Sequence, residues 1–412
     1  MANNEQELKC SFCGTPKSQT KLLIAGINGH ICDNCIQQAS QIVNEEFTET
    51  NRREISDQIK LRKPKDIKAF LDLHIIGQEK AKRVLSVAVY NHYKRLLQKQ
   101  DANDVEIEKS NILLVGQTGT GKTLLAKTIA KLLDVPFCIA DATVLTEAGY
   151  VGEDVESILS RLLQAADYDV TKAEKGIVFV DELDKIARKG DNASITRDVS
   201  GEGVQQALLK LLEGAAVNVP PQGGRKHPEQ KMITVNTKNI LFIAGGAFAD
   251  IDKIIKRRVN KSPIGYSAHD GKNSFDENNV LQYIAPTDLR SFGLIPELIG
   301  RFPVISHLNP LDEESLLRIL TEPKNALIKQ YEKVFEMDKI KLSFEKNVLK
   351  YIVEKAVEYE LGARGLRSIC EVIMNDAMYT LPSEDHKGEF KITLDYAKRQ
   401  FESSEMAKLK VA

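Results

Sequence analysis

A glycine-rich segment between an apolar run and a helix-like run dictates much of what this chain can fold into. Ile112 to Val115 before it predict a buried strand, and Leu124 to Leu133 after it predict a helix. The segment itself matches the pattern G-x-x-x-x-G-K-[ST] and reads Gly116, Gln117, Thr118, Gly119, Thr120, Gly121, Lys122, Thr123. The strand, loop and helix stand in the order that a phosphate-binding P-loop requires.

The residue types in this loop suit a triphosphate and its metal ion. Glycines let consecutive backbone N–H groups point at an anion, and the helix N-terminus adds a positive dipole end. Lys122 can reach the β- and γ-phosphates, and the Thr123 hydroxyl can hold Mg²⁺. The alternative is a glycine-rich turn that matches by chance, but the flanking strand and helix favour a site for ATP and Mg²⁺.

A second apolar run ends in two acids. Ile177 to Val180 predict a buried parallel strand, and Asp181 and Glu182 follow at its carboxyl end, where open α/β sheets bind ligands. We expect Asp181 to join the Mg²⁺ shell and Glu182 to activate water as the general base. The alternative is that both acids cap the next helix, and helix capping is the interpretation that we favour for Asp184.

Four cysteines near the N-terminus form two C-x-x-C pairs. Cys10 and Cys13 precede Cys32 and Cys35 at a spacing typical of a tetrahedral Cys₄ zinc site. Such a site would be structural, because four thiolates leave no open position for water. Two disulfides are the alternative, which a reducing compartment disfavours.

Length and charge set further limits. The 412 residues with 42% hydrophobic content suffice for two or three domains. A net charge of −1 gives no field toward nucleic acid or a membrane, so we expect neither as a partner. No apolar stretch is long enough to span a bilayer and the N-terminus lacks a signal layout, so we expect a cytoplasmic enzyme.

The order of these signals predicts an α/β fold with three parts and a linker. Residues 1–50 would form the zinc module, and the charged residues 51–63 a linker. Residues 64–310 would form a large ATPase domain with a parallel sheet, and 311–412 a smaller, mainly helical domain with a short strand near its end. Ile75 and Ile76, early in the large domain, are candidate walls for the adenine ring, although they could simply pack the core.

Several further segments occur together in one order, and through them the chain resembles the ClpX family of AAA+ unfoldases. The resemblance covers nearly the whole chain and rests on the Cys₄ module, the P-loop and the two acids. It rests equally on four shorter motifs: Gly149-Tyr150-Val151-Gly152-Glu153-Asp154, Arg225-Lys226-His227, Leu294-Ile295-Pro296-Glu297-Leu298-Ile299-Gly300-Arg301 and Gly362-Ala363-Arg364-Gly365-Leu366-Arg367. Each short motif is weak evidence by itself, whereas the occurrence of all four in this order is specific to the family.

The resemblance implies roles for the short motifs. Tyr150 and Val151 would grip a polypeptide in the central channel of a ring, rather than form an ordinary surface turn before a helix that begins near Asp154. A basic entrance loop would attract substrate termini, and it consists of Arg225, Lys226 and His227. Without the resemblance, a solvated charge cluster is the interpretation that we favour for these three residues.

Two arginines take catalytic roles by the same resemblance. Arg301 would act as the arginine finger on the nucleotide of a neighbouring subunit, and Arg364 as the sensor arginine that contacts bound nucleotide. For both, a surface ion pair is the alternative.

The resemblance also implies partners: a homohexamer, the ClpP peptidase, protein substrates and adaptor proteins. The docking loop would include Ile264, Gly265 and Tyr266, and Tyr266 departs from the phenylalanine usual in the family. Its hydroxyl could weaken docking in an apolar pocket, which keeps open a chaperone that works without a peptidase. The other rival, a nucleic-acid remodeller, is disfavoured by the near-neutral charge.

Overall fold

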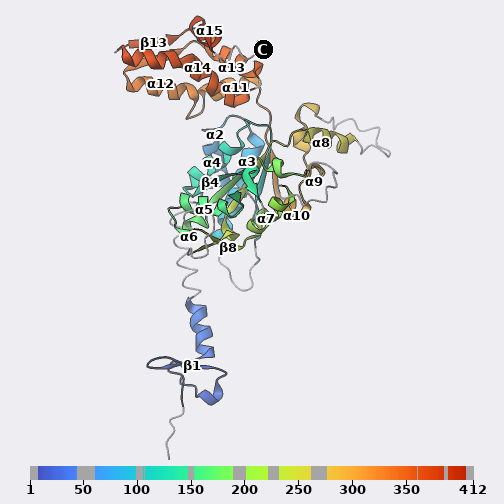
Figure 1. Cartoon of the computed structure of the whole chain (residues 1–412), viewed down its shortest axis with the longest axis vertical. Helices are drawn as coiled ribbons and strands as arrows, with labels where there is room; N and C mark the ends of the chain where they lie inside the picture. The colour runs from blue at the N-terminus through green and yellow to red at the C-terminus, as the bar shows by residue number, and fades with distance from the viewer. Residues whose placement is uncertain are drawn as a thin grey trace, which may run out of the picture. The chain divides into compact units, whose positions relative to one another are not determined.

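The computed structural model describes residues 8–43, 61–98, 105, 107–146, 153–188, 201–220, 232–260, 276–359, 361–384 and 388–404 (Figure 1). The chain divides into two compact units. The first comprises Met1–Leu61 and Leu96–Lys99, and the second comprises Arg62–Arg95 and Gln100–Ala412.

The first unit is built around two short antiparallel strands, β1 (Leu23–Ala25) and β2 (His30–Cys32), joined by a tight turn in which Gly26 N donates to Gly29 O at 2.7 Å. A 3₁₀ turn, η1, precedes them at Lys17–Gln19, and a helix follows over residues 33–43. Among residues 8–43, Cys10 and Cys32 alone are buried. Residues 8–43 of this unit therefore have almost no hydrophobic core.

The second unit contains a five-stranded parallel sheet in the order β11-β3-β10-β7-β4. The strands run β3 Ile112–Val115, β4 Phe137–Asp141, β7 Ile177–Asp181, β10 Leu241–Gly246 and β11 Val304–His307. β3 is buried along its whole length, as a parallel strand covered on both faces should be. Because all five strands are parallel, their carboxyl ends meet at one edge of the sheet.

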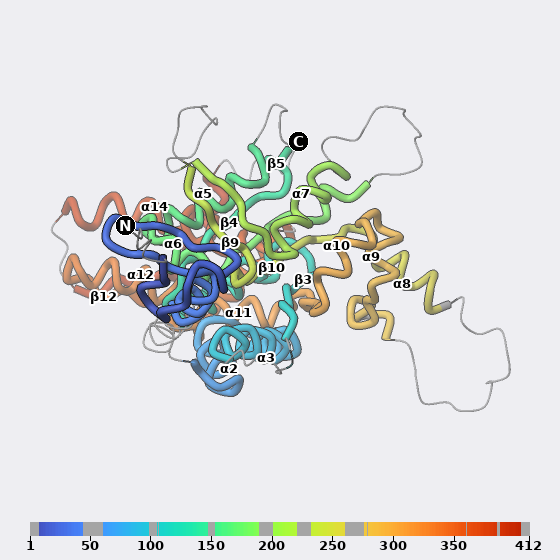
Figure 2. The backbone as a smooth tube through the Cα atoms, turned by 90° about the horizontal axis from the view of Figure 1, so that it is seen from below, coloured from blue at the N-terminus to red at the C-terminus, as the bar shows by residue number. Residues whose placement is uncertain are grey.

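Helices and short strand pairs surround this sheet. The helices are α2 Pro64–Asp72, α3 Glu79–Leu96, α4 Lys122–Leu133, α5 Ser157–Ala165, α6 Val170–Ala173, α7 Glu202–Glu213, α8 Ile251–Asn260, α9 Pro286–Phe292 and α10 Pro296–Gly300. The 3₁₀ turns are η2 Ala142–Val144, η3 Leu183–Ile186, η4 Thr237–Asn239 and η5 Glu277–Tyr283. The paired short strands are β5 Leu145–Thr146 with β6 Glu153–Asp154, and β8 Ala216–Val219 with β9 Ile233–Asn236. Figures 1 and 2 show α8, α9 and α10 grouped at one side of the sheet.

A separate hydrophobic cluster forms beyond residue 310 in the same unit. Its helices are α11 Glu313–Thr321, α12 Leu327–Met337, α13 Lys346–Glu358, α14 Gly362–Ser383 and α15 Leu394–Ser403. They pack with two parallel strands, β12 Ile340–Phe344 and β13 Gly388–Ile392. The expected fold class is thus confirmed, whereas the domain boundaries predicted from the sequence stay a prediction. No helix among the described residues is long and apolar enough to cross a bilayer.

Three local features differ from the sequence prediction. β11 was not predicted, since its run Val304–His307 ends in the polar pair Ser306 and His307, both of which are buried. β12 was not predicted either, although Lys341 and Ser343 alternate with apolar residues in the pattern of a half-buried strand. The helix expected near Asp154 begins at Ser157, after β6.

Candidate nucleotide and zinc sites

The P-loop joins β3 to α4 at the carboxyl edge of the sheet. Gly119 and Gly121 have φ angles of +85° and +100°, which side chains with a Cβ rarely adopt. Gly116 is needed for space, because a Cβ there would lie 2.9 Å from the Cβ of Leu308. The glycines predicted to shape the loop therefore do so for two different reasons, backbone angle and close approach.

Lys122 lies inside this loop. Its Nζ donates to Gly116 O at 2.6 Å and to Gln117 O at 3.0 Å, and its side chain is buried. Burial lowers the pKa of Lys122, while the charges of Asp181 and Asp184 oppose that shift. The ammonium group thus sits among the loop carbonyls, where an anion held by the loop would meet it.

Thr123 and Asp181 converge from two different elements. The Thr123 Oγ1 at the start of α4 donates to the Asp181 Oδ2 at the end of β7, at 2.9 Å. A hydroxyl and a carboxylate side by side, next to a phosphate loop, match the few protein oxygens that Mg²⁺ takes in nucleotide sites. The residues present therefore fit the predicted metal ion.

Glu182 follows directly with a strained backbone. Its φ of +56° is unusual for a residue with a side chain, and its N–H donates to the Asp181 Oδ1 at 3.0 Å. The side chain is exposed. Strain of this kind often accompanies a functional position.

Asp184 does more than start a helix. It lies in the first turn of η3, but its buried carboxylate accepts a hydrogen bond from Ala247 N at 3.0 Å, just beyond β10. A Cβ on Gly246 would lie 2.8 Å from the Asp184 Oδ1. Asp184 therefore ties β7 to the end of β10 beside the P-loop, which the helix-capping interpretation missed.

Ile75 and Ile76 line a cavity of about 560 Å³. Residues from α11, α12 and the segment between them line the same cavity, including Arg318, Lys324 and Lys329. Lys324 N also donates to Leu73 O at 2.8 Å. Both isoleucines are buried and yet contribute to the cavity wall, so the two interpretations of them, core and adenine wall, are compatible.

Arg364 lies in the first turn of α14, next to the P-loop. A Cβ on Gly119 would come within 3.8 Å of Ala363 N. The charge of Arg364 also acts on Lys122, lowering its pKa beyond the effect of burial. The N-terminus of α14 consequently brings both a guanidinium and a positive dipole end toward the loop.

Arg301 lies at the opposite edge of the sheet. It follows α10, and its carbonyl accepts a hydrogen bond from the Nδ2 of Asn111, the residue before β3, at 2.9 Å. Its Nη2 pairs with Glu213 Oε1 at 2.6 Å, with roughly half of each side chain exposed. The surface ion pair weighed from the sequence is thus present, and it is compatible with a further role.

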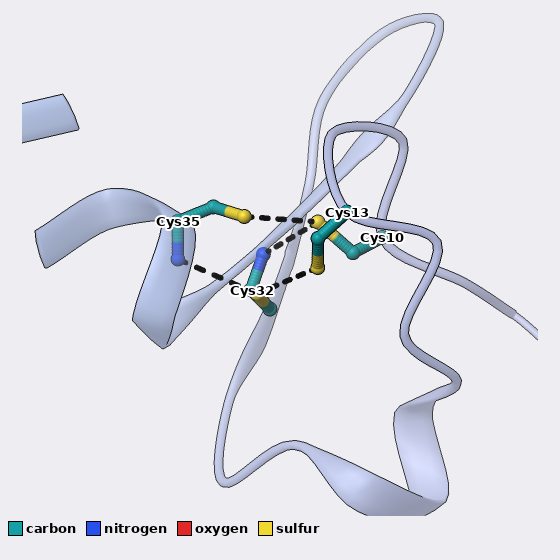
Figure 3. Close-up of side chains that lie close together, drawn as sticks. All are labelled: Cys10, Cys13, Cys32 and Cys35. Carbon is teal, nitrogen blue, oxygen red and sulfur yellow. Dashed lines mark hydrogen bonds between the residues drawn. The ribbon is translucent and has the colours of Figure 1, made fainter. Parts of the chain in front are cut away.

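The four N-terminal cysteines form one cluster (Figure 3). Their Sγ atoms all lie within 4.8 Å of one another, with Cys10 to Cys35 at 3.8 Å and Cys13 to Cys32 at 3.6 Å. A zinc ion at about 2.3 Å from each sulfur places the sulfurs about 3.8 Å apart, whereas a disulfide needs about 2.05 Å. The cluster therefore fits zinc and excludes the disulfide alternative for these four residues.

Backbone N–H groups stabilise the thiolate form of Cys10, the form that binds a cation. A backbone hydrogen bond from Cys13 lowers the pKa of Cys10 to about 6, while a side-chain hydrogen bond with Cys13 raises the pKa of Cys35 to about 12. Cys32 N also points at the Cys10 Sγ, 3.3 Å away. Four thiols so close cannot all ionise together without a positive charge between them.

Eight residues assigned from the sequence lie outside the described residues. They are the channel residues Tyr150 and Val151, the entrance residues Arg225, Lys226 and His227, and the docking residues Ile264, Gly265 and Tyr266.

Fold and sites together define a zinc-containing AAA+ ATPase that uses ATP, Mg²⁺ and Zn²⁺. Comparison with known families agrees: residues 107–305 match the AAA domain (Cdc48 subfamily), 8–45 the ClpX C4-type zinc finger, and 311–392 the C-terminal, D2-small domain of ClpB protein.

Three curated relatives carry the name "ATP-dependent Clp protease ATP-binding subunit ClpX". One from Bacteroides thetaiotaomicron is 65% identical, with 100% of both chains covered. One from Bacteroides fragilis is 64% identical, over 100% of this chain and 99% of its own. One from Porphyromonas gingivalis is 62% identical, over 94% of this chain and 95% of its own. The chain belongs to the ClpX family.

Proposed function

We propose that this chain is an ATP-dependent protein unfoldase and translocase. It recognises tagged or unfolded proteins, unfolds them and threads them into the ClpP peptidase, and it also acts as a chaperone without that peptidase. The printed name of its relatives, an ATP-binding subunit of an ATP-dependent Clp protease, supports the link to proteolysis. We place this activity in the cytoplasm.

At the nucleotide site, each residue has one task. The P-loop, Gly116 to Thr123, holds the phosphates, and Lys122 neutralises charge at the β- and γ-positions. Thr123 and Asp181 hold Mg²⁺, which when bound offsets charge on the phosphates during transfer. Glu182 takes the proton of the attacking water, and Arg364 contacts the nucleotide from the small domain.

One observation carries the proposal that the chain works as a ring: Arg301 cannot serve its own nucleotide. Arg301 binds Asn111 at the amino end of β3, while the P-loop begins at the carboxyl end. Asn111 and Gly116 are five residues apart along an extended strand, about 16 Å at roughly 3.3 Å per residue. An arginine side chain is much shorter, which supports a contact between Arg301 and a phosphate held by another copy of the chain. We take that assembly to be a homohexamer.

Conversion of hydrolysis into movement would use the cavity lined by Ile75 and Ile76. Residues 64–310 and 311–412, the proposed large and small domains, both contribute to its wall, so nucleotide bound there responds to the angle between them. A change of that angle would move Tyr150 and Val151 along a threaded chain. Arg225, Lys226 and His227 would receive the substrate at the entrance.

The remaining parts would select partners. The zinc module, residues 1–50, would recruit substrates and adaptor proteins, with 51–63 as its linker. Ile264, Gly265 and Tyr266 would dock the peptidase, and the hydroxyl of Tyr266 would meet water or a polar group at that contact.

The test combines purified protein, ATP and Mg²⁺, a tagged folded substrate, and ClpP from the same source. Loss of native substrate signal together with peptide release is the expected result. Unfolding without peptide release would retain the unfoldase and remove the docking assignment. Neither activity, with ATPase stimulated by DNA instead, would overturn the proposal. Glu182→Gln serves as the control that binds ATP without driving unfolding.

A further inference from the structure

Arg301 is held by its backbone as well as by its side chain. Its N–H closes α10 on Leu298 O at 3.1 Å, and its carbonyl accepts from the Nδ2 of Asn111 at 2.9 Å. The side chain of Asn111 is almost completely buried, with 1% of the residue exposed. A buried, directional bond of this kind fixes where the arginine leaves the fold.

The buried side chain of Asn111 does not favour the stability of the fold by itself. Its Oδ1 is buried and, within the described part of the chain, has no hydrogen-bond partner. A buried polar atom without a partner destabilises the folded state. Among the described residues, this amide makes one hydrogen bond, to the carbonyl of Arg301. That contact accounts for an asparagine at this buried position.

Glu213 orients the other end of Arg301. It is the last residue of α7, which packs against α10, and its Oε1 lies 2.6 Å from one guanidinium nitrogen, Nη2. A guanidinium has five N–H donors, so this contact, the one that the described residues show for the Arg301 side chain, leaves other donors for a phosphate. Glu213 thus directs the guanidinium without covering it.

β3 connects this anchor to the P-loop. All four of its residues are fully buried, and it pairs with β10 on one side and β11 on the other. A buried strand paired on both edges has little freedom to deform, so a displacement at Gly116 would be transmitted toward Asn111.

We propose that Asn111 and Glu213 are positioning residues for Arg301, and that β3 makes the placement of Arg301 depend on the P-loop of its own subunit. The nucleotide held by one subunit would thereby adjust the arginine offered to the next. This inference rests on the proposed trans role of Arg301.

The experiment uses two inactive full-length subunits. Glu182→Gln supplies an intact Arg301 but does not hydrolyse its own ATP, and Arg301→Ala has an intact site but no arginine to offer. An equal mixture should regain up to about a quarter of the normal ATPase rate, since half the sites and half the arginines are intact. No recovery would remove the trans role itself, and with it this inference.

Asn111→Leu, similar in size and without the amide, is then placed on either subunit. On the Glu182→Gln subunit, which donates the arginine, it should lower the recovered rate about tenfold, because small misplacements of a catalytic group slow the reaction strongly. On the Arg301→Ala subunit it should leave the rate within about twofold. Equal loss from both placements would overturn the positioning role, as would loss from neither.

Glu213→Ala and Glu213→Gln extend the test at an exposed residue where folding is not at risk. In an otherwise normal protein, Glu213→Ala should lower kcat for ATP severalfold with KM unchanged, because it acts on the transition state. Glu213→Gln keeps an acceptor oxygen and should recover part of that loss. The matched control is Glu336→Ala, which breaks a surface pair with Lys333 of 2.8 Å. Equal effects of Glu213→Ala and Glu336→Ala would contradict the assignment.

Discussion

The two units of this chain keep their shape by different means. The zinc unit buries Cys10 and Cys32 and little else among residues 8–43, and leaves Phe12 and Ile27 largely exposed. The ATPase unit buries whole strands, with β3 inaccessible to solvent from Ile112 to Val115. One fold therefore depends on coordination and the other on burial of apolar surface.

This difference also sets how precisely each site is built. In the ATPase unit, strand register brings Thr123 within 2.9 Å of Asp181 although 58 residues separate them in sequence. In the zinc unit, the ligands themselves hold the loops, so site and fold form together. Changes to one unit should consequently leave the other intact.

Zinc removal should produce the largest effect. Because metal binding contributes on the order of 10–16 kcal/mol to such modules, a zinc-selective chelator or Cys10→Ser should unfold residues 8–43. Hydrogen exchange should then become fast over β1 and β2 and remain slow over β3 and β10. Cys138→Ser, at a buried cysteine outside the cluster, is the control. If β1 and β2 stayed protected from hydrogen exchange after chelation, a hydrophobic core that the burial pattern does not show would stabilise them.

Glu182→Gln should affect the ATPase unit and leave the zinc unit unchanged. Removal of the proposed general base should lower ATP turnover about 10²–10⁴-fold with ATP binding retained, and the zinc content should not change. Steady-state ATPase rates, nucleotide titration and metal analysis measure the three quantities. Normal turnover would remove Glu182 from its role. Glu174→Gln is a matched control, at a glutamate bonded to Asn236 N away from the P-loop.

Acid should destabilise the ATPase unit through His92. Burial, followed by the charges of Arg95 and Lys109, lowers the pKa of His92 from 6.5 to about 3, and its Nε2 bonds Asn239 O at 3.0 Å. Between these two pKa values the unfolded chain binds a proton that the folded chain does not. Stability is therefore full above about pH 6.5 and falls as the pH drops toward 3, by on the order of 3–5 kcal/mol.

His92→Gln tests this because glutamine keeps a donor for Asn239 O and does not titrate. Denaturant titrations from pH 7 to pH 4 should show a weaker pH dependence in this variant, while His74→Gln, which leaves His92 in place, keeps the slope of the parent protein. An unchanged slope in His92→Gln would assign the acid sensitivity to other groups.

The features that could be predicted from the sequence are those that depend on short local patterns. The P-loop, its strand, the acids at the end of β7 and the four cysteines each form a short motif, so their elements and the class of protein could be predicted from the sequence. Asn111, Asp184 and Glu213 were not predicted as partners, because each acts across the fold: Asn111 contacts Arg301, 190 positions away. Pairings at such separations depend on strand order, which no local pattern specifies.

β11 shows the same limit from another side. Its burial of Ser306 and His307 follows from pairing with Leu114 and Val115, not from their own polarity. Polar residues at the end of a short edge strand resemble a loop in the sequence until the neighbouring strand is known.

The smallest expected effect concerns the exposed aromatic of the zinc unit. Phe12 is 75% exposed, so Phe12→Ala should change stability by less than about 0.5 kcal/mol. Phe335, 1% exposed in the cluster beyond residue 310, is the matched control, and Phe335→Ala should destabilise by about 3–5 kcal/mol. Thermal unfolding of the zinc-loaded protein, followed by hydrogen exchange in each unit, measures both. If Phe12→Ala loosened the zinc unit as much as Phe335→Ala loosens the other, apolar packing would stabilise both, and coordination would no longer distinguish them.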